Sequence, residues 1–473
     1  MKIKKKSKSR LIVAVISIFM LVVMFANLQS CENYLESDFY IDSDGNIQYI
    51  EDDTPFVMQE PTDKLVVYIS PYNGYIYTPA LNIFREKYPH VEIEVIEFGR
   101  NDADKYFTLL KTELMAGKGP DLILEQPMGG GFLDIYKLMD TGIFVDLQPF
   151  IDEDSEFNLD DYNKAVLDAG RYRGKRYLMP IQYDSQILLT TQEILDAEGV
   201  KVSDLETFDG FIKAITRYNE KYKNNPGKTV FKKQSYCAVV HNVFPWSGIE
   251  LINYATRTVN FDTPYFKSIV EAMKWSYVGD EPTDYDRIPR SLSTVPALEN
   301  QEIFFDLKYG FSYHEFHENY FGLLDKGLTP VFFKYPNIEN ENNARVDRVI
   351  AIPKASKNQI NAYNLIKIIL SEDIQNDSSI YFPMPPVLKS AAKAQFEEAI
   401  HGSGNFQALP PLPEEVFNAY LDLLINVDTC SLITFTPYYE IFRRDMGAYF
   451  EGKKSFDECV KILENSLQIY VSE

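Results

Sequence analysis

Few residues in this sequence have the spacing that catalysis or metal binding requires. The segment His314–His317 places its two histidines three residues apart, whereas the zinc motif His-Glu-x-x-His places them four apart. The segment Gly129–Gly131 is not followed by the Gly-Lys-Ser/Thr that completes a phosphate-binding loop, and no Gly-x-Ser-x-Gly nucleophile motif occurs. We therefore expect no catalytic residue, no metal site and no bound cofactor.

The charge and the apolar content of the chain narrow the class of protein. Its 473 residues include 47 Lys and Arg against 69 Asp and Glu, so the formal net charge is −22. A chain this acidic is poorly suited to bind the phosphate backbone of nucleic acid. A hydrophobic fraction of 45% supports a sizeable core, and the length favours about two to three domains. The four cysteines are too few for a disulfide-stabilised fold.

The N-terminal residues have the layout of an export signal. Residues 1–10 hold six Lys and Arg and no acid, and Leu11–Ala26 is an uncharged apolar run. This run is shorter than the roughly 20 residues that a permanent membrane span needs. The segment Leu28–Cys31 resembles the bacterial lipobox, in which the cysteine is acylated and becomes the new N-terminus. We expect a cleaved signal peptide over residues 1–30 and a lipid such as palmitate on Cys31. An uncleaved signal anchor is the alternative.

An acidic segment, residues 31–63, follows the predicted cleavage site. It contains ten Asp and Glu and no Lys or Arg, which predicts a solvated tether that holds the rest of the chain away from the membrane. Within it, Asp42–Asn46 invites comparison with a calcium-binding loop. Ile47 stands where that loop needs glycine, and Asp53 where it needs glutamate, so an Asp-Gly hairpin turn between short strands is favoured.

From Lys64 onward, apolar runs alternate with helical patterns. The runs suit buried parallel strands, and glycine and proline separate them from the helices. Strand, helix, strand, helix, strand implies right-handed crossovers and a mostly parallel sheet that is covered on both faces. The predicted strands are Leu65–Ile69, Val91–Phe98 and Asp121–Leu124, and the predicted helices are Pro79–Tyr88 and Ala103–Ala116.

Several junctions, in the same order along the chain, resemble those of the family 1 extracellular solute-binding proteins of ABC importers, which are similar to maltose-binding protein. The resemblance extends over roughly residues 64–473. A helix that ends in Tyr-Pro before a β-branched strand, a Gly-Lys-Gly-Pro-Asp junction and a capped closing helix carry it. The matching segments are Ala80–Glu94, Ala116–Asp121, Gly142–Pro149, Gly174–Pro180, Ile350–Asn358 and Gly452–Tyr470.

This resemblance implies an α/β fold of the periplasmic-binding-protein type II class, with two lobes, hinge-crossing strands and C-terminal helices. A ligand would bind in the cleft between the lobes, which close around it. The implied divisions are lobe 1 over residues 64–181 and 300–382, and lobe 2 over residues 182–299 and 383–473. The C-terminal helices belong to the last of these segments.

Candidate ligand-binding residues lie where strands end, because ligands of open α/β sheets bind outside the carboxyl ends of strands. Tyr72 and Asn73 follow the first strand, and Gln126 follows the third. Trp246, one of two tryptophans, is a candidate for stacking or for the core, and Tyr313 is a further candidate. The resemblance adds Asp184 with Tyr183 after the first crossing, as polar contacts, and Tyr438 with Tyr439, as an aromatic pair that stacks on sugar.

These features predict a monomeric, lipid-anchored solute-binding protein on the outer face of the bacterial cell membrane. It would capture a small solute and deliver it to the permease subunits of an ABC importer, without catalysis. A carbohydrate is favoured because the 32 tyrosines offer flat, amphipathic surfaces, and oligopeptides are an alternative. Other hypotheses are a ligand-sensing subunit for a two-component kinase and a secreted glycoside hydrolase.

Overall fold

The computed structural model describes residues 39–41, 47–49, 60–126, 134–225, 227–232, 244–274, 294–309, 313–376, 384–401, 410–432 and 436–473. The chain divides into two compact units, Met1–Phe56 and Val57–Glu473. In the first unit, β1 (Phe39–Ile41) pairs antiparallel with β2 (Ile47–Tyr49), which confirms the predicted hairpin strands. The predicted signal peptide and Cys31 lie outside the described residues. Within these ranges, no helix is long and apolar enough to cross a membrane.

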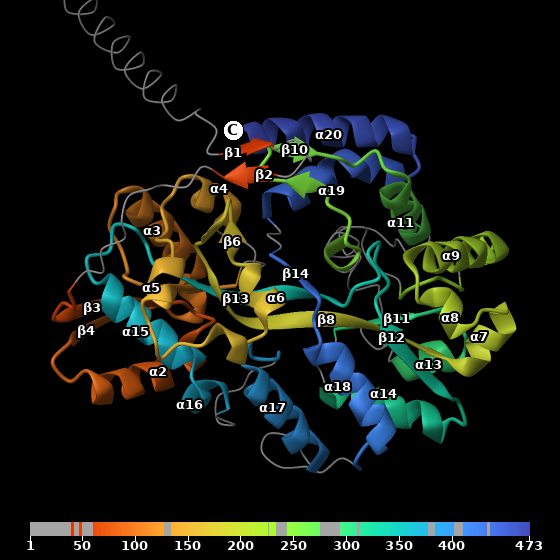
Figure 1. Cartoon of the computed structure of the whole chain (residues 1–473). Coiled ribbons are helices and arrows are strands. Elements are labelled where there is room, and N and C mark those ends of the chain that lie inside the picture. Colours follow the sequence, from red (N-terminus) through yellow and green to blue (C-terminus); the bar gives the residue numbers. More distant parts are fainter. Residues whose placement is uncertain are drawn as a thin grey trace, which may run out of the picture. The chain divides into compact units, whose positions relative to one another are not determined.

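The second unit begins with the predicted alternation of strands and helices (Figure 1). β3 and β4 are parallel, and Val67 bridges to Leu122 in the same sense. Gly117 has a φ of 65°, a left-handed conformation that glycine adopts without strain, and it ends the second helix as predicted. The elements are β3 (Lys64–Ile69), α2 (Gly74–Lys87), β4 (Glu92–Glu97), η1 (Arg100–Asp102), α3 (Ala103–Met115) and β5 (Ile123–Glu125).

The predicted start of the first helix is wrong, because α2 begins at Gly74 and contains Pro79. The side chains of Ile76 and Tyr77 are fully buried, and this burial favours a helix that begins before Pro79. Their backbone N–H groups donate to the carbonyl oxygen of Asn73 at 3.1 and 3.2 Å. The burial of these two side chains offsets the backbone hydrogen bond that the proline cannot make.

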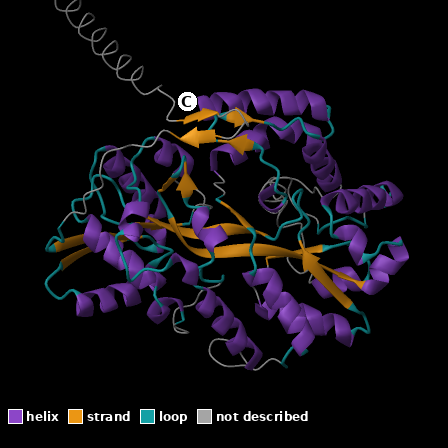
Figure 2. Ribbon diagram, viewed as in Figure 1, coloured by secondary structure: helices purple, strands orange, loops and turns teal. Residues whose placement is uncertain are grey.

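A six-stranded sheet connects the two halves of the second unit (Figure 2). Its longest strand, β8 (Met179–Thr191), is buried along its whole length. β8 pairs antiparallel with β11 (Asp306–Tyr309), β12 (Pro330–Lys334) and β13 (Asn343–Ala351), and β13 also pairs antiparallel with β5 and parallel with β14 (Thr429–Ser431). The parallel order predicted for the first strands holds for β3 and β4, whereas β8 and β13 run antiparallel in this second sheet.

The remaining elements surround these strands. Those before β8 are α4 (Ile135–Asp140), α5 (Gln148–Asp152), η2 (Leu159–Asp161), α6 (Lys164–Asp168), β6 (Arg171–Tyr172) and β7 (Lys175–Arg176). Between β8 and β13 lie α7 (Gln192–Glu198), α8 (Val202–Leu205), α9 (Phe208–Tyr222), η3 (Phe244–Trp246), β9 (Ile252–Asn253), β10 (Thr258–Val259), α11 (Pro264–Lys274), α13 (Thr294–Glu299) and α14 (Tyr313–Asp325). After β13 come α15 (Gln359–Leu370), α16 (Glu372–Gln375), α17 (Lys389–His401), α18 (Glu414–Ile425), α19 (Thr436–Phe450) and α20 (Phe456–Ser472).

Two separate hydrophobic cores define two lobes. The first core draws its buried side chains mainly from Leu65–Ile187 and Ala344–Leu432, and the second mainly from Leu188–Phe305 and Phe442–Leu467. The α14–β12 segment contributes to both cores. The change from one core to the other therefore falls inside β8. We call the two halves the first and second lobe; the residue boundaries inferred from the resemblance remain predictions.

The last helix of the second lobe confirms its sequence signals. The capped closing helix that the sequence predicts is α20, in which Ser455 and Glu458 form a capping box and each accepts a backbone N–H of the other. Apolar residues at helical spacing form one face of α20. Tyr470 on this face is partly buried against the second core, and the others are buried in it: Phe456, Val460, Leu463 and Leu467. Local capping and helical periodicity were sufficient here because both signals lie within the helix itself.

Candidate functional site

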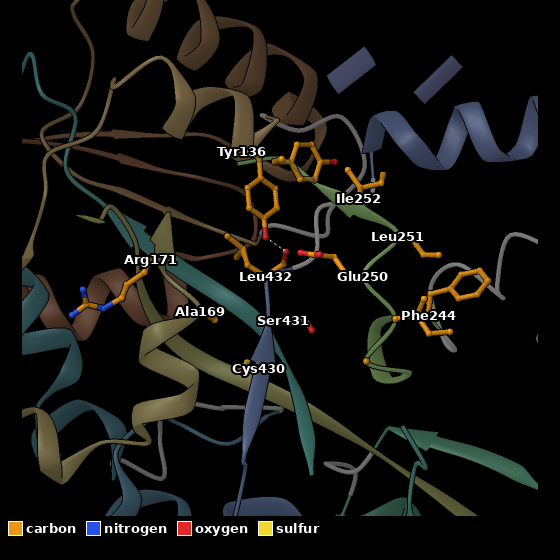
Figure 3. Close-up of a pocket in the computed structure, with 13 residues that line it drawn as sticks. Tyr136, Ala169, Arg171, Phe244, Glu250, Leu251, Ile252, Cys430, Ser431 and Leu432 are labelled. Atoms are coloured by element: carbon orange, nitrogen blue, oxygen red, sulfur yellow. Dashed lines mark hydrogen bonds between the residues drawn. The ribbon is translucent and has the colours of Figure 1, made fainter. Parts of the chain in front are cut away.

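A pocket of about 430 Å³ lies between the two cores (Figure 3). Tyr136 on α4 and Leu432 after β14 belong to the first core, while Phe244 on η3 and Leu251 before β9 belong to the second. This volume lies within the range of small-molecule sites. The further lining residues are Ala169, Arg171, Gly248, Ile249, Glu250, Ile252, Tyr254, Cys430 and Ser431.

Aromatic rings form one wall of the pocket. The rings of Tyr136 and Tyr254 are stacked, with centroids 4.3 Å apart and an angle of 5° between their planes. The Tyr136 hydroxyl donates to the carbonyl oxygen of Leu432 at 2.8 Å, which ties the ring to the end of β14 (Figure 3). Stacking and this hydrogen bond hold both rings in place, so the wall is preorganised.

Two charged side chains line the pocket, and the cation among them is bonded to residues outside it. Arg171 lines it, but its guanidinium donates to Gln148 Oε1 at 2.6 Å and to Asp168 Oδ1 at 3.2 Å, and Figure 3 shows it pointing away from the other lining residues. Glu250 is exposed and accepts a hydrogen bond from Asn253 Nδ2 at 2.9 Å. The lining that the structure describes therefore offers a carboxylate and peptide groups, while its guanidinium is already bonded.

A buried ion pair lies on the strands next to the pocket. Arg345 on β13 stands opposite Ser431 of the pocket lining and opposite Asp184 on β8. Its Nη2 donates to Asp184 Oδ2 at 3.0 Å, and both side chains are almost fully buried. The Trp246 ring lies 5.1 Å from the Arg345 guanidinium carbon. Burial raises the pKa of Asp184, and the nearby Asp347 raises it too, whereas Arg345 opposes the shift.

A second polar cluster joins the other end of β13 to the segments that follow β3 and β5. Arg348 Nη1 donates to Asn73 Oδ1 at 2.6 Å, and Gln126 Nε2 donates to Asp347 Oδ1 at 2.7 Å. Asp347 and Arg348 lie where the pairing of β13 with β8 is irregular, between Val346 and Val349. Two sequence candidates, Asn73 and Gln126, are therefore anchored to the same crossing strand.

Glu125 at the end of β5 is a further buried carboxyl of the first lobe. Burial raises its pKa to about 7, while the hydrogen bond from the Tyr106 hydroxyl and the charge of Arg348 oppose the shift. The first lobe therefore holds a carboxyl whose ionisation is costly in free energy, and the nearby charge of Arg348 offsets part of this cost.

Several buried polar side chains on and near β8 have no hydrogen-bond partner among the described residues. The side-chain amides of Gln182 and Gln186, the hydroxyl of Ser185 and the indole N–H of Trp246 are buried, and they make no hydrogen bond with any residue that the structure describes. Buried polar groups of this kind usually have a protein or water partner. The middle of β8 and the nearby Trp246 therefore place buried polar groups without a hydrogen-bond partner among the described residues.

The structure places the described sequence candidates outside the lining of the pocket. Tyr72 is 48% exposed in the turn before α2, whereas Asn73, Tyr183, Asp184 and Trp246 are buried. Gln126 is partly exposed. None of these side chains lines the pocket, although Trp246 shares η3 with the lining residue Phe244. The ligand-binding roles of all candidates remain predictions.

Three further candidates are placed by their backbone alone. Tyr313 begins α14, and Tyr438 and Tyr439 lie in the first turn of α19. Their side chains are outside the described part of the structure. Sequence reasoning missed Tyr136, Tyr254 and Glu250. No local pattern separates these two rings from the other tyrosines, and the two chain segments meet through the fold.

The chain is similar to known proteins in both sequence and fold. Residues 80–402 match the family model described as bacterial extracellular solute-binding protein. No curated protein sequence is similar enough to the chain to count as a match. The chain is similar in structure to a periplasmic oligogalacturonide-binding protein from Yersinia enterocolitica, with 16% identity, a TM-score of 0.59, and coverage of 86% of this chain and 99% of that one.

Two other solved structures have the same fold. The sugar-binding protein MalE from Xanthomonas citri has 14% identity and a TM-score of 0.58, with coverage of 86% of this chain and 97% of that one. An ABC substrate-binding protein from Listeria monocytogenes in complex with cycloalternan has 15% identity and a TM-score of 0.52, with coverage of 86% and 99%. The fold is thus that of maltose-binding-protein-like solute receptors, as the sequence predicted. Because the family model matches more than half of its residues, the chain belongs to the bacterial extracellular solute-binding protein family.

Proposed function

We propose that this chain is the carbohydrate-binding subunit of an ABC importer, which captures an oligosaccharide between its two lobes and delivers it to a membrane permease. The observation that carries this proposal is the interlobe pocket with the stacked Tyr136 and Tyr254 in its wall. Such rings offer flat faces to the CH groups of a sugar, and the peptide groups and the Glu250 carboxylate can bond its hydroxyls. The solved relatives named above are described as binding oligogalacturonide, sugar and cycloalternan, which supports the ligand class.

The charges of the described lining favour a neutral sugar over an acidic one. A polyuronate needs cations, and the Arg171 guanidinium is bonded to Asp168 and Gln148. Glu250 adds a negative charge, and the protein as a whole has a net charge of −22. Like charges across an interface reduce affinity, so acidic oligosaccharides are the poorer ligands.

The chain without its first 31 residues is expected to bind maltohexaose or cycloalternan in isothermal titration, and to bind an oligogalacturonide at least about tenfold more weakly. Tyr136→Ala should weaken the neutral sugar about tenfold, which corresponds to the loss of roughly 1.4 kcal/mol of stacking. Tyr265→Ala, on the partly exposed face of α11, is the matched control and should leave the affinity unchanged.

Two results would contradict this proposal. The release of shorter sugars from the oligosaccharide would assign the chain to glycoside hydrolysis, and the absence of any sugar-induced rise in melting temperature would remove the ligand class. A tight complex with oligogalacturonide would preserve sugar binding and refute the preference for neutral ligands.

Lipid anchoring at Cys31 completes the proposed function. Growth of cells that express the full chain with labelled palmitate is expected to label the protein, because the export signal and the lipobox-like segment Leu28–Cys31 precede an acidic tether. Cys31→Ala should abolish the label and release the protein from the membrane. An unlabelled wild type, or a labelled Cys31→Ala variant, would be incompatible with the anchor.

A further inference from the structure

A small hairpin of the second lobe reaches across to the first lobe beside the pocket. β9 and β10 pair antiparallel, with Asn253 opposite Thr258. Leu251 before the hairpin and Phe261 after it are buried in the second core, whereas Tyr254 and Ala255 at its turn pack against the first core. The hairpin turn therefore contacts the opposite lobe from the one that holds its ends.

The hairpin is fixed to the last helix, α20, at its turn and after its second strand. Gln468 Nε2 donates to the carbonyl oxygen of Arg257 at 2.9 Å, and Glu464 Oε1 accepts the backbone N–H groups of Phe261 and Asp262 at 2.9 and 3.0 Å. Figure 1 shows β10 beside α20. The hairpin thus belongs mechanically to the second lobe.

On the first lobe, one carboxylate forms an ion pair with this hairpin. Asp140, the last residue of α4, forms ion pairs of 2.8 Å with Arg173 of its own lobe and with Arg257 of the hairpin. The Tyr172 hydroxyl also donates to Asp140 at 3.1 Å. The side chains of Asp140, Arg173 and Arg257 are 23%, 18% and 37% exposed, so water screens these pairs only in part.

Further contacts lie beside the ion pairs. The Tyr172 hydroxyl shares its one proton between Asp140 and the carbonyl oxygen of Tyr254, which lies 3.2 Å away. Arg173 donates to the carbonyl oxygen of Ala255 at 3.1 Å. The Tyr136–Tyr254 stack adds a ring contact. Lys137, next to Tyr136, lies 4.1 Å from the centre of the Tyr470 ring on α20. Four kinds of contact therefore join the two lobes within one small area.

The two arginines that pair with Asp140 share an uncommon backbone conformation. Arg173, at the turn between β6 and β7, has a φ of 48°, and Arg257, at the turn between β9 and β10, has a φ of 56°. A side chain with a Cβ rarely adopts this left-handed region, and such positions usually hold Gly, Asn or Asp. Both turns thus keep arginine where local preference disfavours it, and both guanidinium groups bind the same carboxylate. Backbone strain that persists in this way is a sign of function.

We propose that the β9–β10 hairpin is an interlobe clasp, with Asp140 as the residue that holds Arg257 and thereby stabilises the closed arrangement of the lobes. Asp140 is a positioning residue: it does not line the pocket, and it acts by keeping Tyr254 and the hairpin in place. The clasp itself depends on the two-lobe fold alone. Its effect on ligand release rests on the proposed sugar binding.

Small-angle scattering of the ligand-free chain tests the clasp without any ligand. Asp140→Asn, which keeps the size and the acceptor for Tyr172 but removes the charge, should shift the radius of gyration to a larger value, and so should Arg257→Gly. The wild type should approach the same value in 1 M NaCl, where the screening length is about 3 Å. Glu198→Gln is the matched control, because Glu198 also accepts from a tyrosine hydroxyl and pairs with Lys221 at 2.8 Å, but within the second lobe. Equal radii for the wild type and both clasp variants would refute the clasp.

Release kinetics and thermal unfolding separate the clasp from a purely structural role. Both variants should release maltohexaose about fivefold faster while the association rate stays the same, because a closed state that is less populated loses ligand sooner. Arg257→Gly should not lower the melting temperature, because glycine relieves the left-handed strain. A lower melting temperature with unchanged release would overturn the proposal. If no sugar binds the wild type, the proposed function fails and the scattering result alone decides the clasp.

Discussion

Replacement of Arg345 by methionine is expected to lower the free energy of unfolding by about 3 to 5 kcal/mol. The guanidinium is 2% exposed and its partner Asp184 is fully buried, so the substitution leaves a carboxylate in the interior without its cation. The charge of Asp347 adds to the cost of ionising Asp184, because it also raises the pKa of this carboxyl. Urea unfolding at pH 8, where the carboxyl must be ionised or bind a proton at a cost, measures the loss.

The pH dependence of this loss follows from the direction of the pKa shift. In the folded chain the pKa of Asp184 is raised above its ordinary value, and it rises again when Arg345 is removed. The unfolded chain then releases the proton at a lower pH than the folded chain does, so stability falls as pH increases through the interval between the two pKa values. The destabilisation should therefore be smaller at pH 5 than at pH 8.

A double variant provides the control for the ion pair. Arg345→Met combined with Asp184→Leu removes both charges, and buried ion pairs replaced by apolar side chains are often as stable as the original. The double variant should recover most of the stability that the single variant loses. A double variant no more stable than the single one would show that packing against Trp246, rather than the unpaired carboxylate, accounts for the loss.

Asn73→Ala is the second substitution with a large expected effect, a loss of about 3 to 5 kcal/mol in the free energy of unfolding. The Asn73 side chain donates to Ser70 Oγ at 2.8 Å and to the Leu124 carbonyl oxygen at 2.6 Å, and it accepts from Arg348 at 2.6 Å. A bond to a charged group contributes about 1.5 to 3 kcal/mol and each neutral bond about 1 kcal/mol. Chemical denaturation followed by circular dichroism measures the change.

The adjacent tyrosine supplies the comparison. Tyr72 is 48% exposed, so Tyr72→Ala should change stability by no more than about 0.5 kcal/mol. Asn73→Asp should retain part of the stability, because a carboxylate still accepts from Arg348 while it cannot donate to Leu124 or Ser70. If Asn73→Ala kept its stability and lost sugar affinity instead, Asn73 would belong to the ligand site, as the position after the first strand suggests.

The parts of the fold that could be predicted are those whose signals are local. The capping box at Ser455, the left-handed glycine at Gly117 and the parallel pairing of β3 with β4 all depend on residues close in sequence. The start of α2 was missed because the burial of Ile76 and Tyr77, a tertiary effect, outweighs the local preference of Pro79. Propensity is a weak guide wherever packing opposes it.

The site depends on contacts that no local pattern reveals. Arg257 and Asp140 are 117 residues apart in the chain, and Arg345 and Asp184 are 161 apart. Sequence reasoning placed Asp184 at the crossing strand, but it could not find the buried cation opposite it, because the register of β8 and β13 determines that pairing. The antiparallel crossing sheet was missed for the same reason. Long-range register is a property of the folded chain rather than of its segments.

The interleaving of the two cores affects how the protein is made. The first core needs the strands and helices of Ala344–Leu432 as well as those of Leu65–Ile187. A nascent chain that ends before β13 therefore lacks the strand that pairs with the first half of β8. Contacts this distant in sequence slow folding, because long loops must close before they form. The first lobe is therefore expected to complete its fold only late in synthesis, once β13 has left the ribosome.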